Sequence, residues 1–66
     1  MPNETLESYL LYIFTESIVE ISDEEAKQFA IDAANDGLFS IPANVNWTQQ
    51  IDSARRDSRL LVLATH

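Results

Sequence analysis

The side chains that could carry out acid–base or nucleophilic chemistry are few. The only histidine is His66, the last residue, where no third group can readily orient its ring, so a Ser-His-Asp arrangement is not expected. Carboxylates lie close together at Glu24 and Glu25 and at Asp32 and Asp36. Paired carboxylates need a cleft to act as acid and base, and a single three-helix unit seldom provides one. We therefore expect a protein that is not an enzyme.

One segment partly matches a calcium-binding loop. Residues 32–37 place acids at the first and fifth loop positions and glycine at the sixth. Ala34 and Ala43 stand at the third and twelfth positions, where oxygen ligands are required, so calcium binding is not expected. Without cysteine, and with one histidine, a zinc site within one chain is not expected either. We predict no metal ion and no cofactor.

Positive charge is concentrated at Arg55, Arg56 and Arg59. On a helix these arginines could contact phosphates, but the chain has four basic and eleven acidic residues and a net charge of −7. A field of that sign repels nucleic acid, so no direct nucleic-acid contact is expected. Asp52 lies three to seven residues before the arginines. We predict that they form ion pairs with Asp52 or with acids of the first helix.

The elements that position these residues begin with a helix predicted over about residues 4–20, capped by Asn3. Leu6, Leu10 and Ile13 recur at three- and four-residue steps and mark a stripe that faces the core. Further apolar residues lie outside this stripe, at Leu11, Tyr12, Ile18 and Val19. A helix that is apolar over more than one stripe either lies inside a bundle or meets a second chain.

The second predicted helix begins with the clearest local signal in the sequence. Ser22 and Glu25 have the spacing of a capping box, in which each side chain accepts a hydrogen bond from the backbone amide of the other. The helix should run to about Asp36 and end at Gly37 in the left-handed conformation. The residues predicted to face the core are Ala26, Phe29, Ala30 and Ala33. The three alanines permit close packing against the first helix.

An extended apolar connector is predicted over residues 38–45, because Pro42 biases Ile41 away from the helical conformation. A third helix should begin after Asn46, whose side chain can cap the Gln49 amide. This connector would cover the open end of the core.

Residues 60–64 are apolar all round, and we expect them to form the last turns of the third helix. The predicted fold is therefore an all-α, three-helix domain with an extended apolar connector between helices two and three. The alternative is an α+β fold in which residues 38–41 and 60–64 pair as short strands.

A length of 66 residues predicts one helical domain, residues 1–66. With 45% hydrophobic residues, the chain is too apolar to be intrinsically disordered. Glu7 and Glu16 interrupt the apolar N-terminal run, and no basic region precedes it, so neither a signal peptide nor a membrane span is expected. We expect a cytoplasmic protein, in the host cytoplasm if a phage encodes it.

Charge and the lack of a catalytic constellation predict a protein that works by binding another protein, as an inhibitor or an adaptor. Its size and acidity are similar to those of phage-encoded and bacterial accessory factors. An acidic surface would face a basic surface of the partner, in the sharpest form by mimicking nucleic acid; its residues are Glu4, Glu7, Glu20, Asp23, Glu24 and Glu25. The alternative is a structural or assembly subunit whose apolar surface is permanently buried.

A homodimer is also predicted, because one three-helix unit has a single core and cannot enclose every apolar residue of this chain. Burial of a large aliphatic side chain contributes roughly 1.5–3 kcal/mol, which a small fold can use. The residues expected at the dimer or partner interface are Leu11, Tyr12, Ile18, Val19, Leu60 and Leu63.

Overall fold

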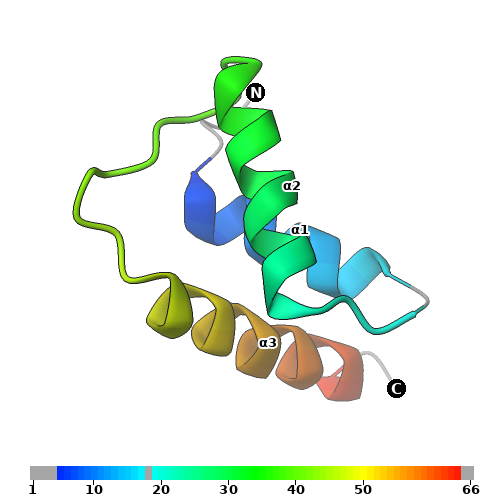
Figure 1. Cartoon of the computed structure of the whole chain (residues 1–66). Helices are drawn as coiled ribbons and strands as arrows, with labels where there is room; N and C mark the ends of the chain where they lie inside the picture. The colour runs from blue at the N-terminus through cyan, green and yellow to red at the C-terminus, as the bar shows by residue number, and fades with distance from the viewer. Residues whose placement is uncertain (1–4, 18, 65–66) are drawn as a thin grey trace.

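The described part of the chain folds into three helices. The computed structural model describes residues 5–17 and 19–64, with α1 at Leu6–Glu16, α2 at Asp23–Asn35 and α3 at Trp47–Ala64. Figure 1 shows α1 and α3 running side by side in the same general direction. α2 crosses in front of α1 at a steep angle, and its beginning lies close to α3. The extended segment between α2 and α3 loops around one end of the molecule. The all-α fold with an extended connector is thereby confirmed.

The start of α1 is set by a capping box that the sequence analysis did not identify. The Thr5 hydroxyl accepts a hydrogen bond from the Ser8 amide at 3.1 Å, and the Ser8 hydroxyl accepts one from the Thr5 amide at 3.0 Å. Thr5 is therefore the N-cap of α1, in place of the predicted Asn3, which lies outside the described residues.

The end of α1 is also earlier than predicted, at Glu16 instead of near residue 20. Ser17 is the C-cap and is extended, with φ −71° and ψ 130°. The hydroxyls of Thr15 and Ser17 donate to backbone carbonyls four residues earlier, at 2.7 and 2.6 Å, and such bonds weaken a terminal helical turn. Val19 consequently lies in the connector to α2, not on the helical face that carries Tyr12.

The boundaries of α2 follow the local signals in the sequence. The Ser22 hydroxyl accepts from the Glu25 amide at 3.2 Å, and the Glu25 carboxylate accepts from the Ser22 amide at 3.3 Å, so the predicted capping box is confirmed. Gly37, beyond the other end, has φ 88°, in the left-handed region. The Leu38 amide then donates to the Ala33 carbonyl at 3.1 Å, as in a Schellman motif.

α3 begins beyond Asn46, whose side-chain oxygen accepts from the Gln49 amide at 3.1 Å. Residues 60–64 continue this helix to Ala64, so the alternative strand pairing is wrong. α3 spans 18 residues but includes several charged ones. Within the described part of the chain, no helix combines the length and the apolar character needed to cross a lipid bilayer.

The core lies where the three helices meet, and the α2–α3 connector closes it. The rings of Phe39 in this connector and Tyr9 in α1 pack with their centres 5.3 Å apart. α2 contributes only alanines, whereas Phe29, predicted to face the core, lies at the flank of the alanine stripe and is exposed. The buried apolar residues are Leu6, Leu10, Ala26, Ala30, Ala33, Phe39, Ile51 and Ala54.

Replacing Ser22 with alanine removes the hydroxyl that caps the Glu25 amide, and the free energy of unfolding should fall by about 1 kcal/mol. The matched control is Ser40→Ala, because Ser40 is exposed in the α2–α3 connector; its effect should stay within about 0.5 kcal/mol. Chemical denaturation of the wild type and both variants measures the difference. An unchanged midpoint for Ser22→Ala would mean that the capping box does not stabilise the first turn of α2.

Candidate functional site

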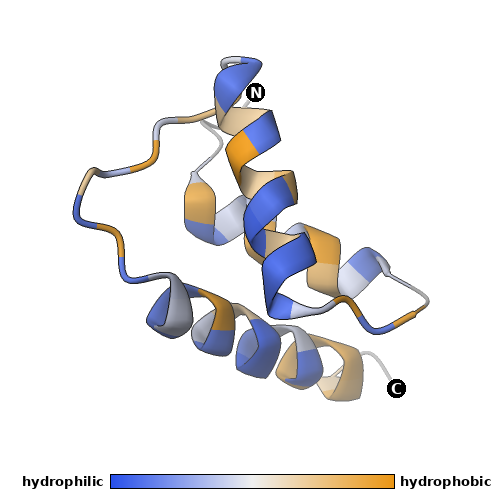
Figure 2. Cartoon of the chain, viewed as in Figure 1, coloured by the Kyte–Doolittle hydropathy of each residue, from blue (hydrophilic) through white to orange (hydrophobic). Residues whose placement is uncertain are grey.

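An open groove of about 480 Å³ lies between the last turns of α3, the end of α1 and the connector that joins α1 to α2. The apolar residues that line it are Phe14, Val19, Ile21, Val62 and Leu63. Val19 and Leu63 are each 72% exposed, so water contacts much of this apolar surface. Figure 2 shows apolar colouring in the last turns of α3. Contiguous exposed apolar surface is typical of an interaction site.

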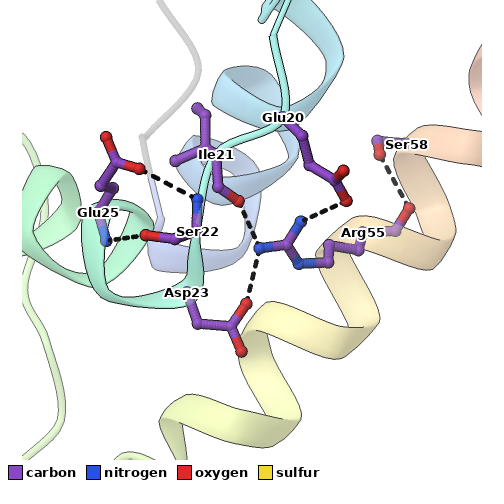
Figure 3. A network of polar contacts seen from close by, with 7 residues as sticks. All are labelled: Glu20, Ile21, Ser22, Asp23, Glu25, Arg55 and Ser58. Atoms are coloured by element: carbon purple, nitrogen blue, oxygen red, sulfur yellow. Dashed lines mark hydrogen bonds and ion pairs between the residues drawn. The ribbon is translucent and has the colours of Figure 1, made fainter.

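Arg55 holds the connector wall of the groove against α3. Its Nη2 atom donates to the Ile21 carbonyl and to the Asp23 carboxylate, both at 2.6 Å. Its Nη1 atom lies 3.9 Å from the Glu20 carboxylate. Figure 3 shows the guanidinium reaching from α3 to these three acceptors. A single side chain thus joins α3 to the end of the connector and to the first residue of α2.

The surroundings of Arg55 explain why an arginine is suited to this position. Its guanidinium carbon lies 4.6 Å from the centre of the Phe14 ring, within cation–π distance, and its side chain is only 20% exposed. Ile21 lies in the connector between two helices, so its carbonyl does not accept a helical backbone hydrogen bond. A partly buried carbonyl needs a hydrogen-bond donor, and Arg55 supplies it. The planar guanidinium can serve the carbonyl and the carboxylate while it stacks on the ring, which the lysine ammonium cannot do in the same way.

The predicted ion pairs of the arginines with Asp52 are not found among the described residues. Glu20, which was predicted to lie at the end of the first helix, does pair with Arg55, but it is part of the connector to α2. The Arg55 side chain points across the helix interface toward this connector and α2. Arg56 and Arg59 are exposed, and neither forms an ion pair with another residue that the structure describes. Arg59 lies at the groove, whereas Arg56 lines a separate, more polar hollow between α1 and α3. The three arginines therefore occupy three different environments.

Three of the residues predicted for an interface lie at or beside the groove. Val19 and Leu63 line it, and Leu60 is exposed on the same turns of α3 but outside the lining. Ile21 and Val62 also line the groove, although neither was among the predicted interface residues. Val62 could have been identified from helical spacing, because it lies seven residues after Arg55 and so on the same face of α3.

The other predicted interface residues lie elsewhere. Leu11 is half-buried and lines the more polar hollow between α1 and α3. Tyr12 is 61% exposed on α1 and lines neither hollow. Ile18 lies outside the described residues. The six predicted residues therefore do not form one continuous surface.

Three of the predicted acidic residues have partners within the fold. Asp23 and Glu20 pair with Arg55, and Glu25 completes the cap of α2. Each of these carboxylates still faces solvent, since all three residues are exposed. They hold the groove and α2 in place as well as adding negative charge to the surface.

Two further acidic residues, Glu7 and Glu24, are exposed and form no ion pair with any described residue. Glu4 lies outside the part of the chain that the structure describes. Glu7 is in the first turn of α1 and Glu24 in the first turn of α2, where negative charge is favourable for the helix dipole. Both carboxylates remain available to a basic surface.

The acids considered for catalysis or calcium binding occupy positions with local structural roles. Asp32 accepts a hydrogen bond from the Gln28 side chain at 3.0 Å, and Asp36 is the C-cap of α2. His66 lies outside the described residues. Across residues 5–17 and 19–64, no three acidic or histidine side chains converge closely enough to hold a metal ion.

Comparison of the chain with known protein families, with characterised proteins and with solved structures finds no match. The features that bear on function are therefore the surfaces of the chain itself. These comprise an apolar groove braced by Arg55 and a largely acidic exterior.

Replacing Arg55 with methionine keeps an unbranched side chain over Phe14 but removes the donors to Ile21 and Asp23. The free energy of unfolding should fall by about 1.5–3 kcal/mol, the usual range for hydrogen bonds that involve a charged group. Arg56→Met is the matched control and should change it by no more than about 0.5 kcal/mol, because Arg56 is exposed and unpaired among the described residues. Chemical denaturation provides the measurement. Equal effects of the two variants would contradict a bracing role for Arg55.

Proposed function

We propose that this chain is a small, acidic, non-enzymatic regulator that binds a partner protein and acts as a homodimer in the cytoplasm. It serves the partner as an inhibitor or as an adaptor. The observation that carries the proposal is the exposure of four consecutive apolar residues at the end of α3, which are Leu60, Leu61, Val62 and Leu63.

This exposed segment supports a binding role on energetic grounds. Burying a large aliphatic side chain contributes roughly 1.5–3 kcal/mol. The interior of this fold has little room for further side chains, because the alanines of α2 let the helices pack closely together. A protein surface can cover the end of α3 and gain that free energy. The same burial would stabilise a fold whose small size limits its own core.

The acidic exterior supports a partner with a basic surface. The chain has a net charge of −7, and the carboxylates of Glu7 and Glu24 are exposed without an ion-pair partner among the described residues. Such a field attracts basic proteins and accelerates their association, and it opposes direct contact with nucleic acid. In the sharpest form of the proposal, these acids imitate the charge of nucleic acid and occupy a basic groove of the partner.

A second candidate function is that of a structural or assembly subunit. The observation that favours it is the high exposure of Val19 and Leu63, which a permanent interface would bury. The two functions differ in their response to salt. Contacts between exposed charges weaken as salt rises, whereas apolar contacts hardly change.

Affinity capture from an extract of the producing cells, at low and at high salt, tests the proposal. The regulator function predicts a specific protein that binds at low salt and is released at high salt. The same protein should be lost from a Glu7→Gln, Glu24→Gln variant, because this variant removes two exposed carboxylates. Asp52→Asn with Asp57→Asn is the matched control, since it removes equal charge from α3.

Other outcomes separate the candidates. A protein that stays bound at high salt, tolerates both charge variants and is lost with Leu60→Asp and Leu63→Asp would favour the assembly subunit. Equal loss with both charge variants would show that only net charge matters. If the wild type captures no protein in greater amount than the Leu60→Asp, Leu63→Asp variant and the charge variants do, the proposal of a specific partner is contradicted.

A further inference from the structure

The groove is lined by two arginines and one glutamate, although the chain as a whole is strongly acidic. Glu20 lies on its connector side, with a side chain that is 83% exposed, and Arg59 lies on its α3 side. Arg55 donates to Asp23 and Ile21 at 2.6 Å and lies 3.9 Å from Glu20, so the shorter of its two ion pairs is with Asp23. The Arg59 side chain forms no hydrogen bond or ion pair with another described residue. The exposed Glu20 carboxylate, held only at 3.9 Å from Arg55, can still accept a second base, and Arg59 can accept an acid. The apolar groove is therefore complementary to a second copy of itself.

We propose that a second copy of this chain occupies the groove, in a two-fold dimer in which Arg59 of each copy pairs with Glu20 of the other copy. In a two-fold interface every contact occurs twice. If Arg59 of one copy meets Glu20 of the other, then Glu20 of the first copy meets Arg59 of the second. An axis that passes between the two sides of the groove brings each base opposite an acid. The inference rests on the homodimer of the proposed function and specifies where its interface lies.

The end of α3 provides the apolar part of this interface. Leu63 stands on the wall of the groove and Leu60 on the adjacent outer face, and both are exposed. A stable interface covers about 800 Å² on each partner, which is about a sixth of the 4977 Å² of accessible surface on this chain. The contact must therefore extend over both the connector wall and the last turns of α3. Each copy thus places the end of its α3 in the groove of the other.

Other occupants are less well matched to the groove. A basic protein is attracted to the exposed acids elsewhere on the chain, and Arg59 repels it at the groove. A wholly apolar peptide would cover the walls but would bring no acid to Arg59. A second copy supplies apolar surface and both charges together.

Sedimentation equilibrium of charge-reversed variants tests the pairing. The wild type should show about twice the chain mass of 7.5 kDa. Arg59→Glu and Glu20→Arg should each raise the dimer dissociation constant by about tenfold or more, because two attractive contacts become repulsive. Arg56→Glu and Glu7→Arg are the matched controls, with the same charge changes outside the groove, and should leave the constant within about twofold. Circular dichroism confirms that each variant keeps its helices.

An equimolar mixture of Arg59→Glu and Glu20→Arg gives the decisive result. One variant then carries acids at both positions and the other carries bases, so a mixed dimer regains two attractive pairs and should return to nearly wild-type mass. A dimeric wild type in which Arg59→Glu behaves like Arg56→Glu would overturn this interface while leaving the homodimer intact. A wild type that stays monomeric at high micromolar concentration would contradict both. Failure of the mixture to recover would also overturn the pairing.

Discussion

The hydrogen bonds of Arg55 hold together the parts of this fold that the chain itself connects only through loops. The guanidinium joins α3 to the Ile21 carbonyl and to Asp23, the first residue of α2, while it stacks on Phe14 of α1. All three helices therefore meet at one charged group. The capping box of Ser22 stabilises the start of α2, and the arginine ties that start to α3. The groove exists because this contact keeps its two walls at a fixed separation.

A second constraint is the small volume of the core. α2 is packed through alanines, which lets the helices approach closely but leaves little room for large side chains. The large apolar residues at the end of α3 consequently remain at the surface. We infer that the chain uses two surfaces for two kinds of contact. An apolar groove with charges of both signs suits self-association, and the acidic exterior suits a basic partner, whose binding is the more sensitive to salt.

The features of the fold that could be predicted depend on residues close together in the chain. The capping box of Ser22, the left-handed Gly37 and the Asn46 cap each involve hydrogen bonds over a few residues, and all three were expected. The end of α1 was not, because the side-chain bonds of Thr15 and Ser17 compete with a helical pattern that the apolar spacing otherwise favours. For α1, periodicity therefore predicted the helix but not its length.

The candidate site was less predictable because it is assembled from distant segments. Asp52 or an acid of the first helix was the expected partner of the arginines, yet Arg55 also donates to the carbonyl of Ile21, which lies 34 residues away in the chain. Tyr12 and Val19 were placed together on the assumption of a longer α1, and the early end of that helix separates them. Leu63 was correctly identified as surplus to the core. The apolar residues outside the core form a shared surface only where the α1–α2 connector lies against α3. The sequence does not indicate the position of this connector.

We propose that the end of α3 and the connector wall braced by Arg55 form one surface that a second copy covers. Isotope-filtered NMR on a mixture of labelled and unlabelled chains tests it directly, because only contacts between copies give filtered signals. A dimer formed through this surface should give signals from the Leu63 methyl groups of one copy to the side chains of Val19 and Ile21 in the other. Filtered signals confined to Tyr12 or Phe29, or none from a sample that sediments as a monomer, would contradict it.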